Sequence, residues 1–177
     1  MNKTLSTSSL SSRFLDGISN SLLPVISWFP LIMAALTVAV VSLRYGLGVG
    51  AITAQEGVIY LHSALFLLGA SCTLGADGHV RVDIFYRRFS DRQKAWVNAL
   101  GHTLFTLPLC VLIGITCWGY VTESWAIREV SPEPGGIPAV FILKSLIPAM
   151  AALLLLQATS EILKSLTILT AEPDDAS

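Results

Sequence analysis

The sequence is short of charged residues, and the shortage lies in long stretches. Asp, Glu, Lys and Arg make up 13% of the 177 residues, whereas a soluble domain usually carries about 25%. Residues 17–43, 57–76 and 95–122 hold no charge, and residues 134–160 hold only Lys144. A bilayer core of about 30 Å is crossed by about 20 apolar residues of a helix, so each stretch is long enough to span it.

These stretches predict an all-α integral membrane protein with four transmembrane helices. We place the spans at about residues 24–43, 57–76, 95–121 and 138–162. The four-helix membrane domain then covers residues 17–166. It follows a Ser- and Thr-rich segment, residues 1–16, that we expect to be mobile, and it precedes a short acidic tail, residues 167–177.

Cysteine is also scarce. Cys72, Cys110 and Cys117 all fall inside predicted spans and form no CxxC pair. A disulfide framework or a zinc site is therefore not expected. We predict no catalytic residue, no metal and no cofactor, and we do not expect an enzyme.

The middle of every predicted span lacks Asp and Glu. Glu56, Asp77, Glu123 and Glu161 all lie at span ends. Carboxylates and broken helices near the bilayer midplane mark ion-coupled transport sites. Apart from a kink expected at Pro148, we predict no broken helix, so this chain is not expected to hold a coupling site of its own.

Lys144 is the one charge inside a predicted span and away from its ends. Its long stem could carry the ammonium to the outer surface, or the ammonium could pair with Glu129 or Glu133. Contact with an anionic substrate is the alternative. We expect a structural role.

Two histidines on successive spans raise the question of haem. His62 lies near the outer edge of the second span and His102 near the inner edge of the third. Antiparallel packing would leave them roughly 13 Å apart in depth, too far to share one iron. We expect both to be packing residues that make hydrogen bonds.

The cations gather between the second and third spans. Five of the eleven lie there: Arg81, Arg87, Arg88, Arg92 and Lys94. Short loops rich in Lys and Arg remain cytoplasmic. With this loop and both termini inside, eight cations are cytoplasmic and two are outside. So few cations on a short loop offer few phosphate contacts, and no nucleic-acid partner is expected.

Local signals predict several helix ends. Ser90, followed by Gln93, has the spacing of a capping box, and the Ala76–Gly78 stretch is typical of a helix stop. Pro138 suits the first turn of the fourth helix. Small residues in the stretch 69–76 allow close helix contact, part of which must serve the chain's own bundle.

Four stretches together resemble a known family. They are "AQE" (54–56), "DGHVRVDIFYRRFSDRQKAWV" (77–97), "SWAIREVSPEPGGIP" (124–138) and "LKSLIP" (143–148). They look like the small membrane subunit of tripartite ATP-independent periplasmic (TRAP) transporters, with most similarity to the branch labelled for mannitol and chloroaromatic compounds. The resemblance covers roughly residues 44–157.

The resemblance implies a multi-pass protein of the bacterial inner membrane, in complex with a large permease and a periplasmic solute-binding protein. Transport in that family is driven by an ion gradient, commonly sodium, and usually carries organic acids. The large subunit holds the substrate and ion sites, and the small one extends its scaffold. A membrane anchor of a redox complex and a self-sufficient small transporter remain as alternatives.

Seven residues are candidates for subunit contact or a structural role: Glu56, His79, Arg81, Asp83, Glu129, Glu133 and Lys144. Arg81 and Asp83 would face the same way on an extended segment. We expect them to pair with each other or with the permease. Beyond these subunits, we expect membrane lipid as the other partner.

Overall fold

The computed structural model describes residues 16–17, 21–78, 86 and 88–170. Within these residues every regular element is helical. Its helices are α2 (Phe29–Gly46), α3 (Ile52–Gly75), α5 (Asp91–Gly101), the π-helical turn η1 (His102–Thr106), α6 (Leu107–Ala126) and α7 (Val140–Thr170). Four helical stretches are long and apolar enough to cross a membrane. The predicted all-α membrane fold is confirmed.

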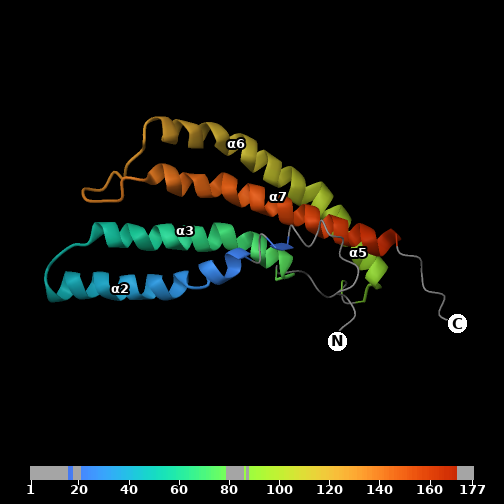
Figure 1. The fold of residues 1–177 in the computed structure, drawn as a ribbon, viewed down its shortest axis with the longest axis horizontal. Helices are drawn as coiled ribbons and strands as arrows, with labels where there is room; N and C mark the ends of the chain where they lie inside the picture. The colour runs from blue at the N-terminus through green and yellow to red at the C-terminus, as the bar shows by residue number, and fades with distance from the viewer. Residues whose placement is uncertain (1–15, 18–20, 79–85, 87, 171–177) are drawn as a thin grey trace.

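The helices form an open row. α2 packs on α3, α3 packs on α7, and α7 packs on α5 and α6 (Figure 1). Only 6–11% of the residues in each apolar stretch are buried inside the chain. Most of the apolar surface is therefore left for lipid or for another protein.

The two ends of the row carry different connections. The turn between α2 and α3 and the loop between α6 and α7 lie together at one end, while the start of α5 lies at the other (Figure 1). We refer to these as the outer and inner ends, following the predicted sidedness. Which end faces the cytoplasm stays a prediction.

Two predicted helix ends are confirmed. The Ser90 side chain accepts the Gln93 N–H, and the Gln93 side chain accepts the Ser90 N–H, which completes the capping box at the start of α5. α3 ends at Gly75, where Asp77 takes a left-handed φ of 56°. The Gly78 N–H then bonds the Thr73 carbonyl at 2.9 Å, which closes the last turn.

The third span contains a π-helical turn that the sequence did not indicate. In η1 the Leu107 N–H bonds the His102 carbonyl, five residues back, in place of the usual four. Pro108 follows directly and has no N–H to offer the preceding turn. The turn therefore widens just before α6 begins.

The fourth helix starts later and ends later than the predicted span. α7 begins at Val140, so Pro138 precedes the first turn instead of forming part of it. The Val140 N–H bonds the Glu129 carbonyl at 3.1 Å, across the base of the outer loop. Pro148 lies inside the helix, as predicted, and the helix continues to Thr170.

The prediction that no span is broken apart from Pro148 is wrong for the first span. Residues 21–26 are helical, residues 27–28 form a turn, and α2 begins at Phe29. Pro30 is the physical reason, because it has no N–H to donate to the carbonyl four residues earlier. Ser27 adds to the break, since its hydroxyl donates to the Leu23 carbonyl at 2.6 Å.

Candidate functional site

Glu56, one turn into α3, holds the outer loop that joins α6 to α7. Its Oε2 accepts the backbone N–H of Ile137 at 2.6 Å. Its Oε1 accepts a hydrogen bond from the Ser131 hydroxyl. Both carboxylate oxygens are therefore engaged by residues of the 127–139 loop, which fixes the loop over the start of α3.

The same contact leaves no room for a side chain at Gly136. A Cβ built there would lie 2.6 Å from Glu56 Oε1 and 2.6 Å from Ser131 Cβ. Next to it, Gly135 takes a φ of 84°, a conformation that L side chains rarely adopt. Its carbonyl accepts the Thr53 hydroxyl at 2.5 Å. Gly136 is thus required by packing, and Gly135 by its backbone conformation.

Lys144, the intramembrane cation, is paired with Glu129. The ammonium contacts Glu129 Oε2, and the Ser124 hydroxyl donates to the same oxygen at 2.6 Å. The ammonium also lies 3.9 Å from the centre of the Tyr120 ring. The hydrogen bonds from Lys144 and then Ser124 hold the pKa of the Glu129 carboxyl below its ordinary value.

The end of α6 turns Glu129 toward Lys144. Arg128 takes a left-handed φ of 49°, and the Glu129 N–H bonds the Ser124 carbonyl at 3.0 Å, which closes the helix. The Arg128 guanidinium lies 5.7 Å from the Trp125 ring centre and 5.5 Å from the Phe141 ring centre. These aromatic contacts stabilise a backbone conformation that is unfavourable for arginine.

A second polar cluster lies toward the inner end and centres on Asp16. Its carboxylate accepts hydrogen bonds from Gln157 at 2.9 Å and Ser160 at 2.8 Å, and it contacts Lys164 at 2.8 Å. Lys164 also pairs with Glu161 at 2.7 Å. Burial opposes the charge on Asp16, but the hydrogen bonds from its three partners outweigh burial and lower its pKa.

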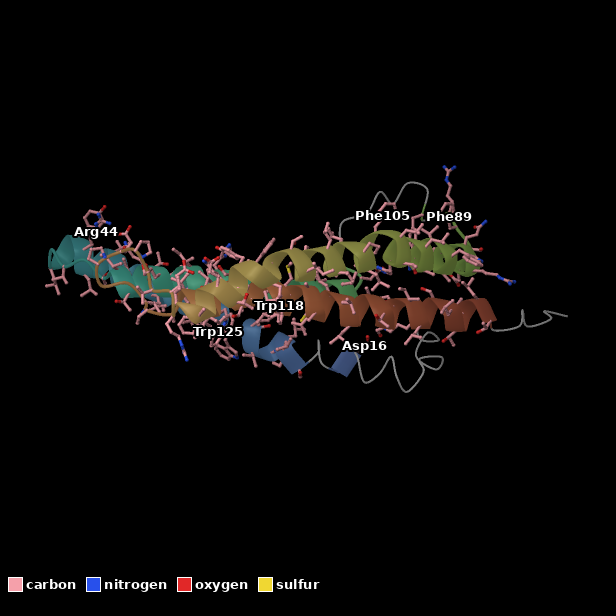
Figure 2. The ribbon with its side chains drawn as sticks, turned by 90° about the horizontal axis from the view of Figure 1, so that it is seen from above. Asp16, Arg44, Phe89, Phe105, Trp118 and Trp125 are labelled. Atoms are coloured by element: carbon pink, nitrogen blue, oxygen red, sulfur yellow. The ribbon has the colours of Figure 1, made fainter. Side chains whose placement is uncertain are left out.

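This inner cluster joins three parts of the chain. Gln157 and Ser160 are 1% and 0% exposed. A Cβ on Gly75, at the end of α3, would lie 2.8 Å from the Gln157 amide nitrogen. The residue before the first span, the end of α3 and the inner half of α7 therefore meet here. Figure 2 shows Asp16 far along the molecule from Arg44, which marks the outer end.

Comparison with known families decides what kind of protein carries these clusters. A family model described as "Tripartite ATP-independent periplasmic transporters, DctQ component" matches residues 33–167, well over half of the chain. The chain belongs to the DctQ family. No curated protein and no solved structure matches it. As a DctQ component it is a small permease subunit of a TRAP transporter and a multi-pass protein of the bacterial inner membrane.

Four of the predicted contact residues of this DctQ chain lie at the outer end. Glu56 binds the outer loop, and Lys144 takes Glu129 rather than Glu133 as its partner. The Glu133 carboxylate makes no ion pair within the described ranges. The remaining candidates, His79, Arg81 and Asp83, lie outside the described residues.

The two histidines that raised the question of haem lie on different elements, His62 on α3 and His102 in η1. His102 Nδ1 lies 3.2 Å from Thr106 Oγ1, inside η1. His62 lies on an exposed face of α3. Among the residues that the structure describes, no three His, Cys, Asp or Glu side chains are grouped so that they could hold a metal ion.

Asp16 is the functional candidate that the sequence reasoning missed. One signal was available on its partner helix, where Gln157, Ser160, Glu161 and Lys164 recur at helical spacing on one face of an apolar helix. A polar stripe of this kind predicts a polar partner. Nothing in the sequence indicated that the partner would come from before the first span.

Proposed function

We propose that this DctQ chain is the small scaffold subunit of a transporter driven by an ion gradient, with sodium as the coupling ion. In this proposal the complex imports an organic acid and includes a large permease and a periplasmic solute-binding protein. The chain contributes no residue to the substrate site or to the ion site. We do not propose an enzymatic activity for it.

The pairing of Lys144 is the observation that carries the proposal. It was the only plausible anchor for an anionic substrate within the spans, and its ammonium already contacts Glu129 and lies over Tyr120. An anionic substrate would have to displace a carboxylate that Ser124 also holds. A charge that is already paired favours a structural role over a binding role.

Reconstitution tests the proposal. The chain, a large TRAP permease and a solute-binding protein from the same organism are incorporated into liposomes, and uptake of organic acids is measured with an inward sodium gradient. We expect uptake only when all three proteins are present, and loss of uptake when potassium replaces sodium. Uptake by this chain alone would contradict the scaffold role and favour a self-sufficient transporter. Haem absorbance in the purified chain would favour the redox anchor.

A further inference from the structure

One stripe of α3 is exposed along the length of the helix. In the row, α2 packs on one side of α3 and α7 on another (Figure 1). Between residues 54 and 74 the exposed side chains follow one another at spacings of three, four and seven residues: Gln55, Ile59, His62, Phe66 and Thr73. These spacings place all five on a single helix face. The stripe is therefore the face of α3 that the chain itself leaves uncovered.

His62 lies inside the bilayer core on this stripe. From Glu56 to Gly75, α3 rises by nineteen residues, which is about 29 Å. Loop backbone adjoins both limits, and such backbone does not face lipid within the core. A core of about 30 Å therefore fits between them. His62 is six residues inward from Glu56, so it lies about 9 Å below the outer edge of the core.

The imidazole of His62 has no partner within the described part of the chain. His102 contacts Thr106, whereas His62 makes no hydrogen bond or ion pair with any residue that the structure describes. Exposed threonines of the spans behave differently. The Thr37 hydroxyl donates to the carbonyl four residues earlier at 2.7 Å, and Thr73 does the same at 3.0 Å. They are satisfied by their own helices, but the hydrogen bond expected for His62 requires another molecule.

Lipid does not meet this requirement. Acyl chains offer no hydrogen-bonding group, and ionisable side chains within spans face protein or a water-filled cavity. The ring of His62 stands on a single methylene, so it lacks the long stem with which lysine reaches the interface. Its neighbours on the stripe, Ile59 and Phe66, are 55% and 71% exposed. An apolar surface with one polar group at this depth suits a second transmembrane helix that carries one polar side chain.

We propose that the exposed stripe of α3 packs against a transmembrane helix of the large permease, and that this helix pairs a polar side chain with His62. The inference rests on the proposed function, since it takes the permease as partner. Ile59 and Phe66 supply the apolar contact around the pair, and the imidazole fixes the depth at which the partner helix lies. Hydrogen bonds between side chains of neighbouring helices join membrane subunits in this way.

Binding of the purified chain to the purified permease in detergent tests the proposal. His62→Leu removes the polar group, and His62→Gln keeps a side chain that forms hydrogen bonds. Thr116→Val is the matched control, because the Thr116 hydroxyl is exposed on α6 and donates to the Leu112 carbonyl of its own helix at 2.8 Å. We expect His62→Leu to raise the apparent Kd at least threefold, while His62→Gln and Thr116→Val stay within twofold of the native chain.

The melting temperature of the isolated chain is measured for the same variants. Because His62 contacts no described residue through a polar bond, His62→Leu should leave this temperature unchanged. A fall would show that the imidazole acts within this chain and would overturn the proposal. Binding by His62→Leu as tight as that of the native chain, or an equal loss in Thr116→Val, would overturn it as well.

Photocrosslinking identifies the molecule that covers the stripe. Benzoylphenylalanine replaces Phe66, the complex is irradiated, and adducts are identified by mass spectrometry. We expect an adduct with the permease, and lipid adducts alone would overturn the proposal. Failure of the native chain to bind the permease in the first place would instead contradict the proposed function, and with it the partner named here.

Discussion

The carboxylate of Glu56 accepts the backbone N–H of Ile137 at 2.6 Å, although 81 residues separate them in the chain. The contact ties the second span to the loop that precedes the fourth. Because Ser131 donates to the other oxygen of the same carboxylate, the loop is held at two points. Together with Thr53, whose hydroxyl donates to the Gly135 carbonyl, this acidic side chain holds the loop at the start of α3.

Replacing Glu56 by Gln should loosen this loop. The amide offers one oxygen where the carboxylate offers two, so one donor of the loop loses its acceptor. We expect a loss of about 1–3 kcal/mol in stability and faster protease cleavage within residues 127–139, measured on purified protein. Glu133→Gln, in the same loop but without an ion pair in the described structure, should change neither quantity. Equal effects of the two variants would contradict the role given to Glu56.

Lys144→Met should distinguish a role of Lys144 in assembly of the complex from a role in substrate binding. The substitution keeps most of the packing of the side chain and removes its charge, which leaves Glu129 with Ser124 as its remaining partner. We expect less complex to assemble, and unchanged apparent affinity for substrate and sodium in the complex that forms. A tenfold loss of affinity, about 1.4 kcal/mol, with normal assembly would show that Lys144 contacts the substrate.

Substitutions at Lys144 and Glu129 should also have coupled effects on stability. Because Lys144 and Glu129 are each other's main partner, removing the second charge should cost less stability once the first is gone. Glu129→Gln combined with Lys144→Met should therefore be more stable than the sum of the two single effects predicts. Thermal unfolding of the four proteins in one detergent gives the comparison. Additive effects would mean that the contact contributes nothing.

Asp16 should stabilise the protein in a pH-dependent way. Its pKa in the folded state lies below the ordinary value of 3.8, so its contribution is present above that pH and is lost as the pH falls through the folded-state value. Asp16→Asn should lower the melting temperature by a constant amount between about pH 5 and 8, and the gap should close below pH 3.8.

The control for this experiment is Asp91→Asn. Asp91 pairs with Lys94 at 3.5 Å, but its side chain is 93% exposed, and an exposed pair of this kind contributes little. We expect this substitution to leave the melting temperature unchanged across the same pH range. A pH-independent gap for Asp16→Asn would argue against the ionised carboxylate as the source of the stability.

The side of the membrane on which each end of the protein lies can be determined with single-cysteine variants of a protein that lacks the three native cysteines. Asp91 and Glu133 are exposed and lie at opposite ends of the row. An impermeant thiol reagent added from the periplasm should label a cysteine at position 133 and leave one at position 91 unlabelled until the membrane is opened. The reverse pattern would invert the predicted topology.

The fold was predictable because the hydropathy of the sequence is enough to locate the four membrane-spanning helices. Four apolar stretches required four helices, and short-range signals such as Ser90 with Gln93 located one helix start. The break at residues 27–28 was missed, although Pro24 and Pro30 flank it. The uninterrupted apolar run concealed it, since hydropathy does not register whether backbone hydrogen bonds are made.

The polar clusters were only partly predictable, because their geometry depends on contacts distant in sequence. The choice between Glu129 and Glu133 as partner of Lys144 was left open, and the left-handed residue Arg128 decides it by turning Glu129 inward. The link from Asp16 to Lys164 joins residues 148 positions apart. No local pattern specifies such a partner.

The open row has a mechanical consequence. Its two hairpins, α2–α3 and α6–α7, meet along the contact between α3 and α7. That contact is pinned near both ends, by Glu56 and Ile137 at one and by Gly75 against Gln157 at the other. A contact pinned in this way resists sliding of α3 along α7, so the two hairpins keep a fixed register along their length. The polar contact of Asp16, before the first span, with Lys164 on α7 adds a further link between the first hairpin and the second.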